Sequence, residues 1–283
     1  MTPSTREKLL VKSPEATPLP ALGEDPAANV VLLDKRPFAL WYDALCRPPQ
    51  AQVDTDNWLI DNIDRFPQSA VLRIWSNSPC LVVSRRDSTW PGFSAATHTL
   101  AKAGFAMATR RSGGTAVLHT PGVLNFTVCH RLPDHRAFSV AESYAVMNDP
   151  VIACLDRLGV PSHVGEVAGS YCAGRYDIVT DGKKLAGTAQ RVKHDARGAI
   201  VLSHLSLNVS NSPGEAHEVI EKFYRTCQRH MDIGKGLITS VNSFLPPENQ
   251  FASARGLAIT LCHYLEGRLE HGNKAVTADA ASS

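Results

Sequence analysis

The strongest constraint on the fold of this chain is a hairpin signal centred near residue 181. A β-prone run at residues 176–180 is followed by Asp181-Gly182 and then by a second β-prone run at residues 183–192. Asp-Gly between two such runs favours a type I′ turn, which joins antiparallel strands. The hairpin therefore favours an antiparallel or mixed sheet over one built from alternating βαβ units.

Further strands and helices are predicted from local pattern. Strands are expected at residues 71–75, 80–84, 105–109, 123–129 and 199–209, and the first two are expected to pair through a turn at 77–79. Helices are expected at 95–103, 139–158 and 251–269. One more is expected to begin after Ser212, which can cap it, with Pro213 suited to the first helical position and Glu215 completing a capping box. Pro150 is expected to kink or split the helix at 139–158. These elements predict an α+β fold in which helices flank a mixed, largely antiparallel sheet.

Composition predicts one compact domain with two polar ends. Residues 1–28 are rich in proline, alanine and charge, which is typical of a flexible arm, and the small polar residues 271–283 predict a disordered tail. Hydrophobic residues make up 43% of the 283, enough for a core, and no glycine–serine linker divides the middle of the chain. A single domain is therefore expected at 29–270.

Charge and cysteine usage exclude some classes of function. The net charge of +2 gives no electrostatic reason to expect nucleic acid or an anionic membrane as partner. No apolar run approaches the roughly 20 residues of a membrane span, and the N-terminus lacks a secretory signal. Seven cysteines without a CxxC pair are typical of reduced thiols, so a cytoplasmic protein is expected. No metal site is expected, because the pair Cys227 and His230 lacks a second pair at zinc-binding spacing.

The first motif with chemical potential is a glycine loop after two arginines. Arg110-Arg111-Ser112-Gly113-Gly114 leads through His119 to Asn125. Glycines let backbone N–H groups approach an anion, and arginine presents a planar fork to carboxylate or phosphate. The loop is neither a Walker loop nor a dinucleotide fingerprint, because the spacing of both is absent. An anion-holding loop is one interpretation, and a glycine turn with solvated arginines is the other.

The second motif is the hairpin itself, with Gly174-Arg175-Tyr176-Asp177-Ile178 before the turn. On a strand, Lys184 and Lys183 point to opposite faces, so one lysine faces outward and the other can enter a pocket. A lysine in a pocket is suited to a carbonyl or phosphoryl oxygen. Gly187 interrupts the strand where a ligand or another backbone can approach. The alternative is a lysine-rich surface hairpin.

The two motifs together resemble a known family. RRSGGTAVLHTPGVLN, followed some 60 residues later by GRYDIVTDGKKLAGTAQR, resembles the lipoate–protein ligases and their relatives, the octanoyl transferases. LRIWSNSPCLVVSRRDS resembles the early strands of the family more weakly, and the resemblance spans about residues 55 to 210. It implies the catalytic-domain fold of biotin and lipoyl protein ligases at 29–270, and attachment of a lipoyl or octanoyl group to a lysine of a lipoyl-carrier domain.

The resemblance also assigns roles to individual residues. Lys184 matches the family lysine that contacts the acyl carbonyl and the phosphate. The acyl- and nucleotide-binding positions that it implies are Arg110, Arg111, Ser112, Gly113, Gly114, His119, Asn125, Gly187, Thr188 and Ala189. Two residues depart from the family pattern: Thr115 replaces a third glycine of the loop, and Ser84 replaces a glycine at the end of an early strand.

Two chemistries within the family remain open. A ligase uses ATP and Mg²⁺ to form an acyl-adenylate, and Arg110, Arg111 and Lys184 can neutralise the phosphate. A transferase needs no cofactor, because a cysteine takes the acyl group from an acyl carrier protein as a thioester. Cys172 is the candidate nucleophile, because it precedes the lysine hairpin and a nearby lysine favours the thiolate.

The sequence gives divided signals on this choice. The GRYDI block resembles the ligases, and it favours the adenylate route. Only about 70 residues follow the last predicted strand, whereas many ligases of the family carry a further C-terminal domain, so this length suits a transferase or a ligase with an accessory chain. A catalytically inactive module that binds lipoate or a carrier domain is the competing class, supported only by Thr115 and Ser84. Biotin transfer is disfavoured, because RRSGG stands in place of the GRGRxG type of loop.

Overall fold

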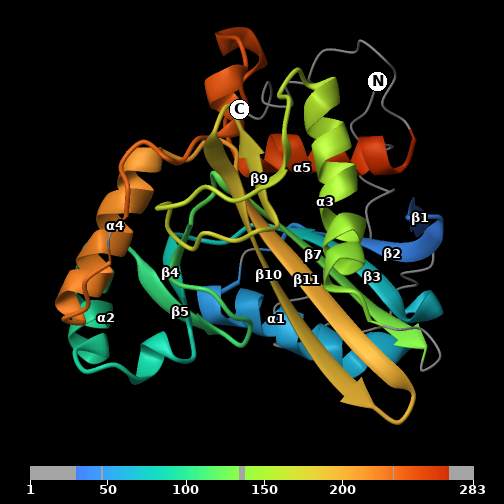
Figure 1. The fold of residues 1–283 in the computed structure, drawn as a ribbon, viewed down its shortest axis with the longest axis horizontal. Helices are drawn as coiled ribbons and strands as arrows, with labels where there is room; N and C mark the ends of the chain where they lie inside the picture. Colours follow the sequence, from blue (N-terminus) through green and yellow to red (C-terminus); the bar gives the residue numbers. More distant parts are fainter. Residues whose placement is uncertain (1–29, 46, 134–137, 232, 268–283) are drawn as a thin grey trace.

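The structure is a computed structural model that describes residues 30–45, 47–133, 138–231 and 233–267. It combines two sheets with five α-helices packed around them (Figure 1). The predicted α+β class, with a mixed and largely antiparallel sheet and flanking helices, is confirmed. The arm at 1–28 and the tail at 271–283 lie outside the described residues.

The larger sheet has eight strands in the order β1-β2-β3-β7-β11-β10-β9-β8. Only the pair β2–β3 is parallel, and the other pairs are antiparallel. The strands are β1 (Val30–Leu33), β2 (Arg36–Asp43), β3 (Ala70–Trp75), β7 (Val123–Pro133), β8 (His163–Gly165), β9 (Asp177–Thr180), β10 (Lys183–Asp195) and β11 (Gly198–Asn208).

A smaller sheet of three strands has the order β5-β4-β6. Its strands are β4 (Cys80–Ser84), β5 (Ala106–Arg110) and β6 (Val117–His119). The expected pairing of 71–75 with 80–84 is wrong: β3 pairs with β2 and β7, and β4 pairs with β5 and β6. Because both edges of β3 are occupied within the large sheet, the link at 76–79 carries the chain into the second sheet instead of closing a hairpin.

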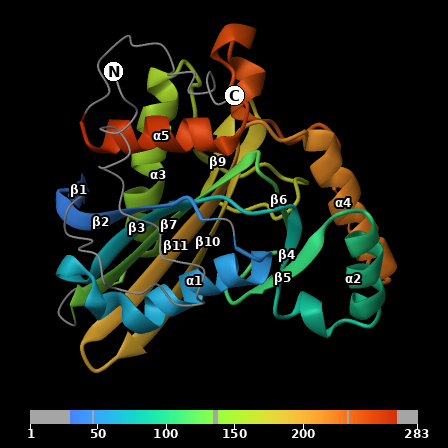
Figure 2. The ribbon, with the colours of Figure 1, turned by 180° about the vertical axis from the view of Figure 1, so that it is seen from behind.

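Helices cover both faces of the large sheet (Figures 1 and 2). Apolar residues of α1 pack on one face together with Val71, whereas the next residue, Leu72, packs on the opposite face with residues of α3 and α5. Helices α2 and α4 pack together against the small sheet. The helices are α1 (Pro49–Asn62), α2 (Phe93–Lys102), α3 (Val140–Arg157), α4 (Pro213–Thr226) and α5 (Ala254–Leu265).

Two helices differ in detail from the prediction. Pro150 lies inside the continuous helix α3, so the helix is not split. Ser212 is the N-cap residue of α4 and Pro213 follows in the first turn, but the Ser212 side chain makes no capping hydrogen bond. No helix in the described ranges is long and apolar enough to cross a membrane.

The hairpin predicted around Asp181-Gly182 is present in the structure. Asp181 and Gly182 have φ angles of 48° and 67°, and Thr180 pairs with Lys183 across the turn. Two successive positive φ angles are the type I′ geometry. The register shifts by one residue between Lys184 and Ala186.

Candidate active site

A pocket lies where the two sheets meet, and most of the predicted site residues surround it. Its walls come from α1, the segment between β5 and β6, the loop that carries Cys172, and strands β10 and β11. The predicted residues that line it are Arg110, Arg111, Ser112, His119, Cys172, Gly187, Thr188 and Ala189. Gly113, Gly114, Asn125 and Lys184 stand behind or beside this lining.

Arg110 holds the shape of its own loop. Its side chain is buried and donates hydrogen bonds to the carbonyl oxygens of Val82 at 2.9 Å, Gly113 at 3.0 Å and Thr115 at 2.6 Å. Burial lowers the pKa of Arg110, and the nearby Cys172 partly offsets that effect. Arg111 is exposed at the pocket. Of the two arginines predicted to bind an anion, Arg110 is therefore buried and Arg111 is exposed to solvent.

Gly114 allows the loop to approach Cys172 closely. It has a φ of +94°, and a Cβ atom there would stand 2.7 Å from Cys172 Sγ and 3.0 Å from Arg110 Nη2. Both the backbone conformation and the missing side chain are thus required. The space around Gly113 is open. The predicted use of glycine for close backbone approach holds at Gly114, with the thiol of Cys172 as the neighbouring group.

Cys172 sits in the pocket wall in a strained conformation. Its φ is +50°, and its Sγ accepts a hydrogen bond from the backbone N–H of Thr115 at 3.1 Å. A non-glycine residue in the left-handed region costs about 1 to 3 kcal/mol, and such residues cluster at functional sites. The sulfur therefore has the Thr115 N–H and the Arg110 guanidinium as its polar neighbours. All six described cysteines are free, and of these Cys172 is the one that lines the pocket.

Lys184 is buried, as the strand alternation predicts, and Lys183 is exposed. Its Nζ donates to the carbonyl oxygens of Tyr171 at 3.0 Å and Cys172 at 2.5 Å, and pairs with Asp177 Oδ2 at 2.8 Å. Gly187 makes room for it, since a Cβ there would lie 3.2 Å from Nζ. The lysine therefore fixes the backbone of the loop that carries Cys172, and its contact with an acyl carbonyl or phosphate stays a prediction.

Asp177 completes this anchor. Its carboxylate also accepts hydrogen bonds from the backbone N–H groups of Gly174 at 2.8 Å and Thr188 at 3.0 Å. Burial raises the pKa of Asp177, and the charge of Lys184 acts against that rise. The ion pair thus ties the loop of residues 171–174 to strand β10, which explains why the aspartate and the lysine occur together in the second motif.

His119 and Asn125 form a buried polar chain beneath the pocket. His119 Nε2 lies 3.1 Å from Ser206 Oγ, and that hydroxyl donates to Asn125 Oδ1 at 2.7 Å. Burial, reinforced by the charge of Arg110, lowers the pKa of His119 to about 3. The imidazole is therefore neutral at physiological pH, and this chain orients groups without carrying charge.

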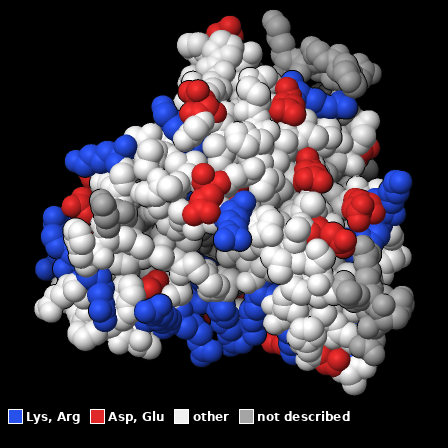
Figure 3. Space-filling view, viewed as in Figure 1, with Lys and Arg blue, Asp and Glu red and all other residues white. Residues whose placement is uncertain are grey.

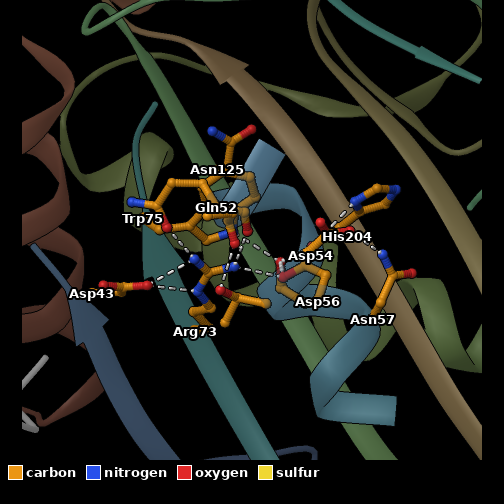
Figure 4. Close-up of polar contacts among 12 residues, drawn as sticks. Asp43, Gln52, Asp54, Asp56, Asn57, Arg73, Trp75, Asn125 and His204 are labelled. Carbon is orange, nitrogen blue, oxygen red and sulfur yellow. Dashed lines mark hydrogen bonds and ion pairs between the residues drawn. The ribbon is translucent and has the colours of Figure 1, made fainter. Parts of the chain in front are cut away.

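Two further polar residues of the pocket lining, Asp56 and His204, were not predicted from the sequence. His204 Nδ1 lies 3.6 Å from Asp56 Oδ2 (Figure 4). His204 Nε2 lies 2.9 Å from Ser112 Oγ. Both residues line the pocket. The sequence carries no recognisable signal for Asp56, because the helix α1 was not predicted. His204 lies in a predicted strand, but nothing in the pattern singles it out.

Asp56 is held in place by a buried ionic network (Figure 4). Arg73 Nη1 donates to Asp56 Oδ1 at 2.8 Å, Arg73 Nη2 donates to Asp43 Oδ2 at 2.7 Å, and Thr127 Oγ1 donates to Asp56 Oδ2 at 3.1 Å. Burial acts to raise the pKa of Asp56, but the hydrogen bond from His204 and the charge of Arg73 outweigh it and lower that pKa. Asp56 is therefore an ionised carboxylate facing His204.

The comparison with protein families identifies the class of this domain. Residues 48–255 match the model of the lipoyl protein ligase A/B catalytic domain. The chain therefore belongs to the lipoyl protein ligase A/B family, as the two motifs indicate. In the part of the chain that the structure describes, no group of three or more His, Cys, Asp or Glu residues is arranged to hold a metal ion.

Curated relatives and solved structures refine the comparison. The chain is 36% identical over 158 residues to the octanoyl-[GcvH]:protein N-octanoyltransferase of Kyrpidia tusciae, covering 54% of each chain. It is 29% identical over 194 residues to the enzyme of the same name from Geobacillus kaustophilus, covering 68% of this chain and 65% of that one. The matched region thus spans between about half and two thirds of the length of these relatives.

Two solved structures share the fold. A lipoate protein ligase-like protein of T. acidophilum with bound lipoic acid superposes with a TM-score of 0.57 at 17% identity, covering 81% of this chain and 84% of that one. Lipoate-protein ligase A bound with ATP superposes with a TM-score of 0.53 at 19% identity, covering 80% and 84%. At such identities the likeness establishes the fold alone.

Proposed function

We propose that this chain transfers octanoyl or lipoyl groups to a lysine of a lipoyl-carrier domain through a thioester on Cys172. The observation that carries the proposal is the setting of the Cys172 sulfur. It lines the pocket, accepts the N–H of Thr115 at 3.1 Å and adjoins the Arg110 guanidinium. A cysteine sulfur that is open to a pocket, with an N–H donor and a cation beside it, is placed to act as a nucleophile.

The lining of the pocket suits a hydrocarbon chain. Apolar side chains make up a large part of its wall: Val53, Ile60, Trp75, Val82, Val117 and Leu202. A pocket with an apolar wall and a few placed polar groups is the usual design of a small-molecule site. The acyl tail occupies the apolar part, and its carbonyl carbon faces Cys172.

Two of the three cations that an adenylate route would use, Arg110 and Lys184, are already engaged. Arg110 donates to three backbone carbonyls, and Lys184 is bonded to two carbonyls and Asp177. That leaves Arg111 and Arg191 as the lining cations that face solvent at least in part. The arrangement therefore favours the transferase over the ligase with ATP and Mg²⁺, the alternative that the GRYDI block suggests.

The names of the relatives supply the donor. Those enzymes take octanoyl from octanoyl-GcvH, so the donor proposed for this chain is the octanoyl-lysine amide of GcvH, a lipoyl-carrier protein. An acyl carrier protein is the alternative thioester donor. Lys and Arg side chains gather where β5 and β10 approach one another (Figure 3), and Arg111 and Arg191 line the pocket there. This surface suits a partner with negative charge around its modified lysine.

The test is an intact-mass assay on a purified lipoyl-carrier domain. The chain is offered octanoyl-GcvH or octanoyl acyl carrier protein without ATP, or octanoate with Mg-ATP. Transfer without ATP is expected, and Cys172→Ser should abolish it. Cys227→Ala removes a buried thiol outside the pocket lining and serves as the matched control.

Two outcomes would contradict the proposal. Modification only with Mg-ATP would establish the ligase chemistry and make Cys172 a structural residue. Binding of octanoate or of the carrier domain without any mass shift, from all donors and with lipoate in place of octanoate, would identify a binding module.

A further inference from the structure

Transfer from an amide donor requires a group that moves protons. A lysine amine is a poor leaving group unless it gains a proton as the bond to the acyl carbon breaks. The incoming lysine must lose a proton when it attacks the thioester. We propose that His204, oriented by Asp56 and linked to the reacting atoms through Ser112, is the general acid–base of the reaction. This inference rests on the proposed function.

The side chains of Ser112, His204 and Asp56 form a chain of two successive contacts. Ser112 Oγ lies 2.9 Å from His204 Nε2, and Asp56 Oδ2 lies 3.6 Å from His204 Nδ1. All three residues line the pocket that Cys172 lines. The Asp56 carboxylate favours the tautomer with its proton on Nδ1, so that Nε2 accepts from the Ser112 hydroxyl. Arg73 and Thr127 fix Asp56 from behind.

The other titratable residues of the described pocket lining cannot take this role. Arginines at 110, 111 and 191 keep their protons in proteins. His119 stays neutral because burial lowers its pKa to about 3, and its Nε2 already contacts Ser206. Lys184 is buried behind Gly187 and holds two carbonyls and Asp177. Among the described lining residues this leaves His204, whose imidazole has one nitrogen that can accept a proton and one that can donate it.

The two half-reactions then balance. In the first, Cys172 Sγ bonds to the acyl carbon and the amide C–N bond breaks. The proton that Cys172 loses on ionising, a step that solvent water can also perform, is delivered by Nε2 through the Ser112 hydroxyl to the departing lysine amine. In the second, the neutral acceptor amine bonds to the acyl carbon and the C–S bond breaks. The amine proton returns by the same path to Cys172.

The experiment compares two donors that differ in their need for an acid. Octanoyl-GcvH has an amine leaving group, whereas 4-nitrophenyl octanoate releases an anion that needs no proton. Transfer from octanoyl-GcvH to a carrier domain is followed by mass, and acylation by the ester is followed as a burst of nitrophenolate. His204→Gln is expected to lower transfer by about 10²- to 10⁴-fold and the burst by less than about tenfold. Ser112→Ala should lower transfer at least about tenfold with the burst retained.

Controls separate this inference from the proposed function. His98→Gln replaces an exposed histidine of α2 and should change neither rate. If His204→Gln lowers both rates equally, or lowers neither, the acid–base role is wrong while the thioester stands. If the wild-type chain gives no burst that depends on Cys172, the proposed function and this inference both fail. An octanoyl adduct that resists neutral hydroxylamine would place the acyl group on Ser112 and overturn the relay.

Discussion

Replacing Lys184 by methionine removes one end of an ion pair whose two side chains are 1% and 0% exposed. Two backbone carbonyls lose their donor, at about 1 kcal/mol each, and the Asp177 carboxylate is left in the interior without a counterion. Breaking a buried pair in this way costs about 3 to 5 kcal/mol in total. The double variant Lys184→Met/Asp177→Asn removes the charge but not the loss at the carbonyls. We expect it to recover part of the loss, because the two carbonyls still lack their donor and the single oxygen of asparagine can accept only one of the Gly174 and Thr188 N–H groups.

The loss of stability in Lys184→Met depends on pH with a defined sign. Burial raises the pKa of Asp177 and Lys184 opposes the rise, so removing the lysine raises that pKa further. A carboxyl with a raised pKa in the fold binds more protons there than in the unfolded chain, so stability falls as pH rises between the two pKa values. The deficit relative to the wild type is therefore expected to be smaller near about pH 4 than near about pH 7.

Urea unfolding of the wild type, the single variant and the double variant at both pH values measures these quantities. The same loop carries Cys172, so acyl transfer should disappear in Lys184→Met even where the fold persists. An equal deficit at both pH values, or a double variant no more stable than the single one, would refute the argument. The anchor would then be a set of neutral hydrogen bonds with no energetic role for charge.

Two further changes test the site. Gly114→Ala places a Cβ atom 2.7 Å from Cys172 Sγ on a residue with a φ of +94°, so we expect the transfer rate to fall at least about tenfold with a small loss in unfolding free energy. Gly104→Ala, in open space at a φ of +86°, controls for backbone strain alone. The pKa of His119 is lowered to about 3 by burial, whereas the unfolded chain protonates it near about pH 6.5. Stability therefore falls as the pH decreases between these values, and His119→Gln should remove part of that fall in a urea titration.

The parts of the fold that the sequence predicts are those determined by neighbouring residues. Asp181-Gly182 specifies its turn by local conformation, and the glycine loop follows from the same local freedom. The pairing of β3 depends instead on β2 and β7, of which β7 lies some 50 residues away. Local pattern identified 71–75 and 80–84 as strands but contains no information on which partners occupy their edges.

Helix α1 was missed for a different reason. Its buried side chains include the polar residues Gln52, Thr55 and Asp56, so it lacks a clean apolar face. Two of these polar residues can be buried because Arg73, on the adjacent strand β3, supplies hydrogen bonds to them. Arg73 Nη2 donates to Gln52 Oε1 at 2.6 Å, and Arg73 Nη1 donates to Asp56 Oδ1 at 2.8 Å. A pattern based on hydrophobicity treats such residues as solvent-exposed, and it fails where the core itself is ionic.

Each of two ionic clusters of the core fixes a residue that lines the pocket. Lys184 with Asp177 fixes the loop of Cys172, and Arg73 with Asp43 and Asp56 fixes the carboxylate that faces His204. Buried ion pairs are often less stabilising than apolar residues of the same volume. Their placement is therefore explained better by the geometry that they impose on the nucleophile and the imidazole than by stability. On this reasoning, apolar replacement of either whole cluster would preserve the fold more readily than it preserves acyl transfer.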